Sequence, residues 1–278
     1  RDDGRFEDAL VEPYKALFEK PLARVAKSAQ SKKIVIVPDR SMHGLPFSAL
    51  GDRKRRLIQD HAVSVAGSAT LYAFSLAQDR ELSGESEQAV RLFADPKINP
   101  NLDLDLPSLT GARREVKRIA EVYSTGADVL PPITGDQATV PEFIARSAES
   151  TILHLAVHGV AIPDVPPRSF LLLAPTADES GAIDAERLLK QLQLKRTRLA
   201  VLSACSSAGG TPVGPEGLAP LVRPFIAAGV PGLVGTLWSV SDDTATEDLL
   251  VRFHQHYRDG HDADEALRKA QLEMLADE

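Results

Sequence analysis

Short apolar runs alternate with amphipathic segments along most of the chain. The apolar runs end at proline, glycine or polar residues, which is typical of buried strands in a parallel sheet. From these runs we predict strands at residues 34–37, 62–66, 90–94, 128–130, 151–157, 170–173, 199–204 and 232–238. The amphipathic segments predict helices at residues 5–29, 69–78, 112–123, 139–148, 183–193, 216–228, 242–257 and 262–275. This alternation predicts an α/β fold with a mainly parallel sheet and helices on both of its faces.

Two features indicate how the chain is divided. Residues 1–30 form an amphipathic helical segment ahead of the first strand, and we expect it to be the end of an upstream domain. Residues 31–278 contain no long Gly/Ser-rich or Pro-rich linker. Within them, residues 96–107 combine three prolines with several polar residues, which indicates a loop or a junction between subdomains.

Composition narrows the range of functions. Hydrophobic residues make up 43% and charged residues 26% of the 278 residues, as in ordinary globular domains. A net charge of -7 argues against a nucleic-acid binder with a strong basic face. No apolar run approaches the roughly 20 residues of a membrane span. The single cysteine, Cys205, excludes an internal disulfide and a Cys-based zinc site. We expect it to act as a free thiol in the reducing cytoplasm.

Reactive residues follow two of the predicted strands. His158 and Gly159 follow the strand at 151–157, and Cys205 follows the strand at 199–204. Ligands bind beyond the carboxyl ends of strands in open parallel sheets. A neighbouring imidazole can take the proton of a thiol, and backbone N–H groups at such turns can hold an oxyanion. The pattern therefore indicates a Cys–His dyad, with a buried apolar cysteine and a hydrogen-bonded histidine as the structural alternative.

The other histidines do not indicate a metal site. His154 lies between two leucines, which favours a hydrogen-bonded core residue. His254 and His256 are two residues apart on a predicted helix and do not share a face. No metal-ligand spacing connects His43, His61 and His261 to another ligand. Since phosphate-loop and Gly-x-Ser-x-Gly motifs are also absent from the sequence, we expect neither a metal nor an organic cofactor.

The two strand ends resemble the signatures of the CHAT family of caspase-like cysteine peptidases, which are relatives of separase. Residues 153–159 read Leu-His-Leu-Ala-Val-His-Gly, and residues 201–205 read Val-Leu-Ser-Ala-Cys, as in the family. The similarity extends over about residues 33–275 through further segments at 37–39, 45–47, 68–70, 217–219, 225–230, 236–243 and 265–271. Residues 206–209 depart from the family pattern, in a loop that shapes the substrate cleft.

The resemblance implies a caspase-like three-layer sandwich over residues 31–278. In this division, residues 31–106 form a degenerate subdomain and residues 107–278 the catalytic one. It further implies that Cys205 is the nucleophile and His158 the general acid/base. The backbone N–H groups of Gly159 and Cys205 are then expected to line the oxyanion hole.

The resemblance also implies where a substrate is recognised. In separase, an aspartate after a Leu-Trp pair receives the basic residue before the scissile bond, and Asp242 falls on that position. Asp243 and Glu216 are the substitutes for this role. Ser203 and Trp238 complete the expected substrate-binding set. The structural alternative is that Asp242 and Asp243 open a helix as capping residues.

Three functions compete on these observations. The first is a cysteine endopeptidase that cleaves a specific protein partner after a basic residue, under the control of an upstream or separate regulatory or sensor domain. The second is a catalytically silent scaffold of the same fold that acts by protein binding. The third is a Cys-dependent acyl transferase or amidase. We expect no direct contact with nucleic acid or with a membrane.

Overall fold

The computed structural model describes residues 3–25, 33–52, 54–84, 88–162, 164–203, 219–238 and 240–277. Its helices are α1 Asp3–Tyr14, α2 Lys20–Val25, α3 Leu57–Asp60, α4 Ala69–Leu82, α5 Thr110–Val122, α6 Val140–Ser147, α7 Ala185–Gln191, α8 Ala219–Ala227, α9 Thr244–Arg258 and α10 Ala263–Ala276. Its strands are β1 Lys33–Ile36, β2 Ala62–Val65, β3 Ala89–Pro96, β4 Asp128–Val129, β5 Ile133–Gly135, β6 Ile152–Ala156, β7 Gly159–Val160, β8 Phe170–Leu172, β9 Ala182–Asp184, β10 Leu199–Leu202 and β11 Gly232–Gly235.

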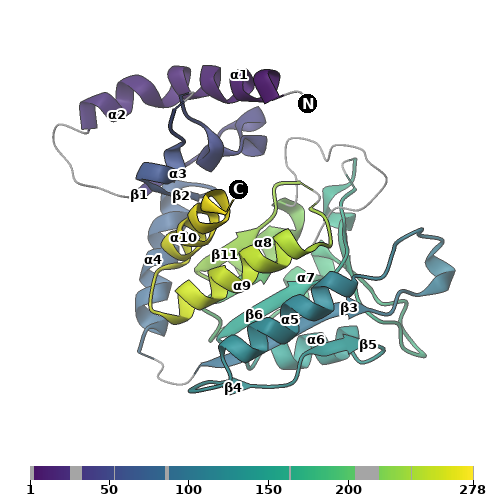
Figure 1. Cartoon of the computed structure of the whole chain (residues 1–278). Coiled ribbons are helices and arrows are strands. Elements are labelled where there is room, and N and C mark those ends of the chain that lie inside the picture. The colour runs from purple at the N-terminus through teal and green to yellow at the C-terminus, as the bar shows by residue number, and fades with distance from the viewer. Residues whose placement is uncertain are drawn as a thin grey trace.

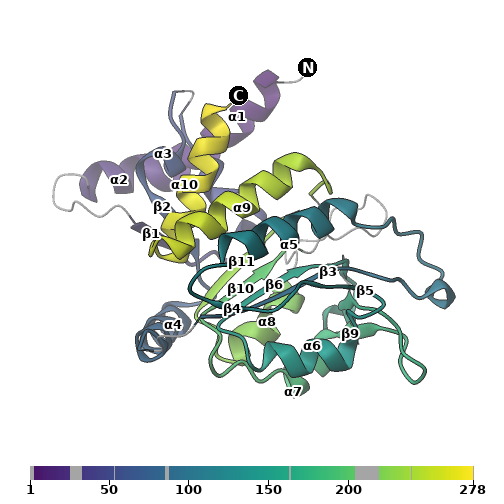
Figure 2. The same ribbon diagram turned by 60° about the horizontal axis from the view of Figure 1, so that its bottom comes forward.

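A parallel sheet forms the middle layer of the molecule. Its strands lie in the order β11-β10-β6-β3-β4, and β5 also pairs with β3. Helices α5 and α9 cover one face, while α6, α7 and α8 cover the other (Figures 1 and 2). The α/β fold with a mainly parallel sheet and helices on both faces is therefore confirmed, and with it the three-layer sandwich.

Alternating residues of β6 supply both halves of the core. Leu153 and Leu155 pack on the α6–α8 side, in a cluster that includes Phe143, Leu188 and Phe225. Ile152 and Ala156 pack on the α5–α9 side, in a cluster that includes Val116, Ile119 and Phe253. The period of two in a strand sends neighbouring side chains to opposite faces. Because both faces of β6 are covered, the strand reads as a continuous apolar run apart from His154.

A second, smaller parallel sheet consists of β1 and β2. It packs with the amino-terminal helices around a small cluster of Leu10, Ile36, Phe47, Leu50 and Leu57. Helix α10 lies against β2 (Figure 1), where Asp264 accepts from Ser64 and pairs with Lys33 at 2.7 Å. The division of the chain at about residue 106 stays a prediction, and the larger sheet already includes residues 89–96 through β3.

The structure corrects two of the predicted helices. Residues 183–184 were expected to begin a helix, yet they belong to β9, which pairs antiparallel with β8 in the sheet β7-β8-β9. The helix starts later because the Asp184 carboxylate accepts from the backbone N–H of Arg187 at 2.7 Å and so caps α7. The strand leaves Ile183 fully buried. The amino-terminal helix also differs, since a π-helical turn at Lys15–Glu19 joins α1 to α2.

Four buried polar side chains form a chain of hydrogen bonds between β6, α5 and α9. Glu115 Oε1 lies 2.6 Å from Nε2 of His154, whose Nδ1 lies 3.0 Å from Nε2 of His254. Nδ1 of His254 lies 3.1 Å from the Tyr123 hydroxyl. Burial raises the pKa of Tyr123 and lowers the pKa of His254, which is further lowered by His154. The expectation that His154 is a hydrogen-bonded core residue is confirmed.

The lowered pKa of His254 predicts that the protein loses stability in mild acid. Below about pH 6.5 His254 binds a proton in the unfolded chain but not in the folded protein. The free energy of unfolding therefore falls by up to about 1.4 kcal/mol for each unit by which the pH is lowered. Urea unfolding between pH 7 and pH 5 should therefore show a flatter pH dependence for His254→Gln than for the wild type. The exposed His43 provides the control, and His43→Gln should keep the wild-type slope. Equal slopes for His254→Gln and the wild type would show that His254 is protonated in the folded protein.

Candidate active site

The pairing of β6 with β10 sets the geometry of the two reactive strand ends. The strands are parallel neighbours, with Leu155 level with Leu202. His158 follows Leu155 by three residues, and Cys205 follows Leu202 by three residues. The described ends of β6 and β10 therefore lie side by side at one edge of the sheet. Cys205 itself lies outside the described residues, as do the other residues of 204–218.

The ring of His158 has a defined hydrogen bond. The side chain is buried, and its Nε2 lies 2.8 Å from the backbone oxygen of Pro107. Since a carbonyl oxygen only accepts, Nε2 carries the hydrogen and donates it. In the neutral ring, Nδ1 is then the atom that accepts a proton. This orientation suits a general base that works through Nδ1.

Gly159 pairs with Leu171 between β7 and β8. The adjacent bond runs from the N–H of Leu172 to the oxygen of His158 at 2.9 Å. This pattern makes Gly159 and Leu171 a non-hydrogen-bonded pair of the antiparallel ladder, in which the backbone polar groups point away from the partner strand. The N–H of Gly159 is thus directed away from β8, as an oxyanion donor requires.

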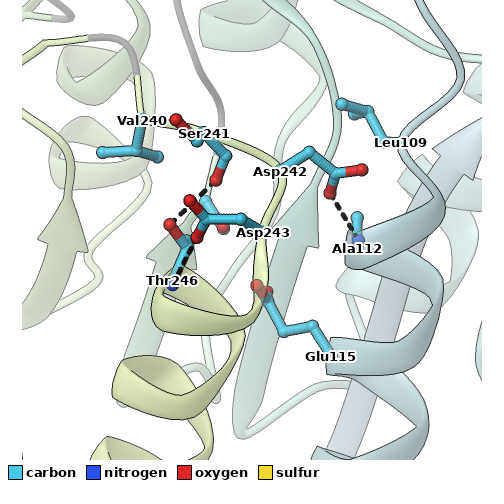
Figure 3. A pocket seen from close by; sticks show the side chains of 9 residues that line it. Leu109, Ala112, Glu115, Val240, Ser241, Asp242, Asp243 and Thr246 are labelled. Carbon is cyan, nitrogen blue, oxygen red and sulfur yellow. Dashed lines mark hydrogen bonds between the residues drawn. The ribbon is translucent and has the colours of Figure 1, made fainter.

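Three of the predicted substrate-binding residues lie around one small pocket. Ser203, Asp242 and Asp243 line it together with side chains of α5 and α9, Glu115 among them (Figure 3). The cavity measures about 20 Å³, room for about one water molecule. Ser203 directly follows β10, so the pocket adjoins the strand end that leads toward the cysteine.

The other predicted substrate-binding residues are not part of this group. Trp238 lies beyond β11 with 56% of its surface exposed and does not line the pocket. Glu216 lies outside the described residues.

The two aspartates cap two different helices. Asp243 caps its own helix, because its Oδ1 accepts from the N–H of Thr246 at 3.1 Å at the start of α9. Asp242 reaches the neighbouring helix, where its two carboxylate oxygens accept from the N–H groups of Gly111 and Ala112 at the start of α5, each at 2.7 Å. Figure 3 shows the bond to Ala112. The alternative of capping the helix that follows is confirmed for Asp243, whereas Asp242 caps a different helix, α5, which the sequence did not predict.

Charged contacts join the helices that form the pocket walls. The buried Glu247 of α9 accepts from Arg114 at 3.1 Å and from Arg118 at 2.8 Å, both on α5. Arg118 also donates to Asp248 at 2.6 Å. Because one buried carboxylate joins two arginines, the contact fixes the spacing between α5 and the first turn of α9. The pocket is lined by residues of both helices.

Two functional positions were missed from the sequence. The backbone oxygen of Pro107 gives no sequence signal, since any residue can present a carbonyl. Gly111 does give one, because glycine in the first turn of a good helix indicates a close approach. A Cβ at this position would lie 2.5 Å from Oδ1 of Asp242, so the aspartate reaches the helix only if residue 111 is glycine.

The described residues contain no group of three or more His, Cys, Asp or Glu side chains that could hold a metal ion. Among the helices of the described segments, none combines the length and apolar character needed to cross a membrane.

Comparison with protein families gives a match over nearly the whole chain. The model of the CHAT domain family matches residues 8–278, which include most of α1 and all later elements. A comparison with curated proteins found no similar sequence.

The capping geometry predicts that Asp242 stabilises the fold as well as shaping the pocket. Asp242→Ala removes the acceptor of two N–H groups at the start of α5, which should lower the free energy of unfolding by about 1–2 kcal/mol. Asp242→Asn keeps one acceptor oxygen and should lose less. Urea unfolding measures both, with Asp178→Ala at an exposed loop carboxylate as the control. An Asp242→Ala protein as stable as Asp178→Ala would contradict the capping role.

Proposed function

The chain belongs to the CHAT domain family, and from this premise we propose that it is a cysteine endopeptidase that cleaves a specific protein partner. The observation that carries the proposal is the register of β6 and β10, since residues 158 and 205 each follow level strand positions by three residues. The family is caspase-like. The proposal adds that this member is active and assigns the dyad to His158 and Cys205.

The proposed reaction begins with proton transfer. Nδ1 of His158 takes the proton of the Cys205 thiol, while the Nε2–H bond to Pro107 holds the ring in place. The thiolate attacks the scissile carbonyl, and the oxyanion that forms accepts from the N–H groups of Gly159 and Cys205. The intermediate collapses as His158 returns the proton to the leaving amine. Water, deprotonated by His158, then hydrolyses the thioester and restores the thiol.

The charge of the pocket supports cleavage after a basic residue. Asp242, Asp243 and Glu115 place three carboxyl groups around it, and among the described residues that line it there is no lysine or arginine. An anionic side chain is disfavoured there by repulsion. A guanidinium or ammonium group gains charge-assisted hydrogen bonds at the mouth of the pocket, since the cavity itself has room for about one water molecule. Each oxygen of Asp242 already accepts one N–H bond, and a carboxylate oxygen can accept a second. We assign the recognition of the basic residue to Asp242, with Asp243 and Glu216 as its substitutes.

The remaining parts of the proposal follow from the chemistry of the thiol. A single nucleophilic cysteine stays reduced in the cytoplasm, where we place the protein. A regulatory or sensor domain, upstream or on a separate chain, keeps such a peptidase from cutting other proteins. The competing function is a silent scaffold of the same fold, which would bind a partner without needing the thiol.

The first test removes each member of the dyad. His158→Ala and Cys205→Ala should each lower peptide cleavage by at least about a thousandfold, and the double variant should resemble either single one because the two act as a unit. The measurement uses fluorogenic peptides and a peptidyl chloromethyl ketone, with the adduct located by mass spectrometry. His43→Ala, an exposed histidine, should keep wild-type activity. Cleavage by purified Cys205→Ala would exclude the dyad, and a wild type that neither cleaves nor is labelled would favour the scaffold.

The second test concerns the cleaved residue. In a panel with Arg, Lys, Asp, Leu or Asn before the scissile bond, kcat/KM should be about 10- to 100-fold higher for Arg than for Leu, as expected for a charge-assisted hydrogen bond. Arg should exceed Lys if the contact is bidentate. Asp242→Ala should remove this preference when it is assayed below its unfolding transition. A wild-type preference for Asp or Leu, or an Arg preference that persists in Asp242→Ala, would remove Asp242 from substrate recognition.

A further inference from the structure

We infer that Asp95 is a positioning residue for His158: its carboxylate holds the turn at residues 107–109, and the carbonyl of Pro107 in that turn orients the imidazole. The inference builds on the proposed function, because the catalytic consequence requires His158 to act as the general base. The orientation of the ring can be measured without any substrate.

Asp95 stands out by its backbone. It lies at the carboxyl end of β3, where the pairing with β5 shifts between Ala94 and Pro96. Its φ of 42° is uncommon for a residue other than glycine, and it directly precedes a proline. Bulges of this kind are frequent beside active sites, where they redirect a side chain. The strained conformation points to a function for this side chain.

The carboxylate of Asp95 is buried and satisfied entirely by the start of α5 and the turn before it. Oδ1 accepts from the N–H of Leu109 at 2.7 Å and from the hydroxyl of Ser108 at 3.1 Å. Oδ2 accepts from the same hydroxyl at 3.0 Å and from Nε of Arg113. Because Asp95 bonds to two consecutive residues, Ser108 and Leu109, it fixes both the position and the rotation of the turn.

The turn transmits this constraint to His158. Pro107 directly precedes Ser108, and its carbonyl oxygen accepts from Nε2 of His158 at 2.8 Å. Strand β3 is also the direct neighbour of β6, with Ala94 level with Ala156, so Asp95 and His158 leave the sheet at the same edge. Pro107 and Ser108 are themselves exposed, and the packing around them is therefore sparse. Asp95 is the buried group that anchors them.

A purely structural role makes a different prediction. Leu109 is the N-cap residue of α5 and offers no side-chain cap, so Asp95 also serves as an acceptor for the helix start. If capping were its whole role, its loss would lower stability and leave the ring of His158 unchanged. If it positions the turn, its loss releases the Pro107 carbonyl, and Nε2 loses the partner that fixes its hydrogen.

The chain offers variants that separate these roles. Asp95→Ala removes the whole anchor. Asp95→Asn keeps an oxygen in the Oδ1 position, which holds Ser108 and Leu109, and loses the ion pair with the half-exposed Arg113. Ser108→Ala removes one contact at an exposed residue and should fold like the wild type. Asp184→Ala removes the matched carboxylate cap of α7 and serves as the control for stability alone.

The decisive measurement is long-range proton–nitrogen NMR of His158 near pH 8, which reports which ring nitrogen carries the hydrogen. The wild type should show the hydrogen on Nε2. Asp95→Ala should show a mixture of both tautomers and a kcat about a hundredfold lower with KM within about twofold, as expected when a catalytic group is misplaced. Asp95→Asn should restore the wild-type signal, Ser108→Ala should fall between them, and Asp184→Ala should lose stability only.

A wild-type tautomer in folded Asp95→Ala would overturn the inference. If that variant does not fold, an unchanged tautomer in Ser108→Ala overturns it, and a mixed tautomer supports it. Failure of the proposed function has a different signature. In that case the wild-type protein cleaves no peptide, and the rate at which its single cysteine is alkylated is the same in His158→Ala as in the wild type. The NMR signal still decides the role of Asp95 in that case.

Discussion

The register of β6 between β3 and β10 is the constraint on which the rest of the molecule depends. Parallel pairing puts the carboxyl ends of all three strands at one edge, and the observed register sets Leu155 level with both Phe93 and Leu202. A slip of one residue would exchange the faces of β6, placing His154 in the apolar α6–α8 cluster without its hydrogen-bond partners. Burial of both faces therefore specifies the register, and the register brings the candidate site together.

Helix α5 is held at its start by residues from the site itself. Its N-cap residue, Leu109, has no side chain that can cap, and the acceptors come from elsewhere in the sequence. Asp95 accepts from the N–H of Leu109, while Asp242 accepts from those of Gly111 and Ala112. Stability and the shape of the site are consequently coupled, because each carboxylate serves both. In the proposed function, a substrate bound by Asp242 would act directly on the start of this helix.

The two histidines of the segment 153–159 have different roles because one lies inside β6 and the other beyond its end. His154 is inside β6, where it links Glu115 and His254 across the core. His158 lies beyond the strand, where its ring is oriented by a backbone carbonyl. Glu115 connects His154 to the pocket, since its side chain both bonds to His154 and lines the pocket. The buried hydrogen-bond chain thus fixes β6, the strand that carries the candidate general base, relative to a wall of the pocket.

The apolar runs and the helical periodicity were enough to predict the α/β class, most strands and helices, and the two strand ends with reactive residues, because these features depend on local pattern. The sequence also indicated that His154 is a core residue. It did not reveal that residues 182–184 form a strand, because this short segment is defined as a strand by its pairing with β8. Nor did it show that Asp242 reaches α5, or that the carbonyl of Pro107 contacts His158 while Asp95 binds the next two residues. Pro107 and His158 are 51 residues apart in the sequence, and Gly111 and Asp242 are 131 apart. Only the packing of parallel strands and helices brings such positions together.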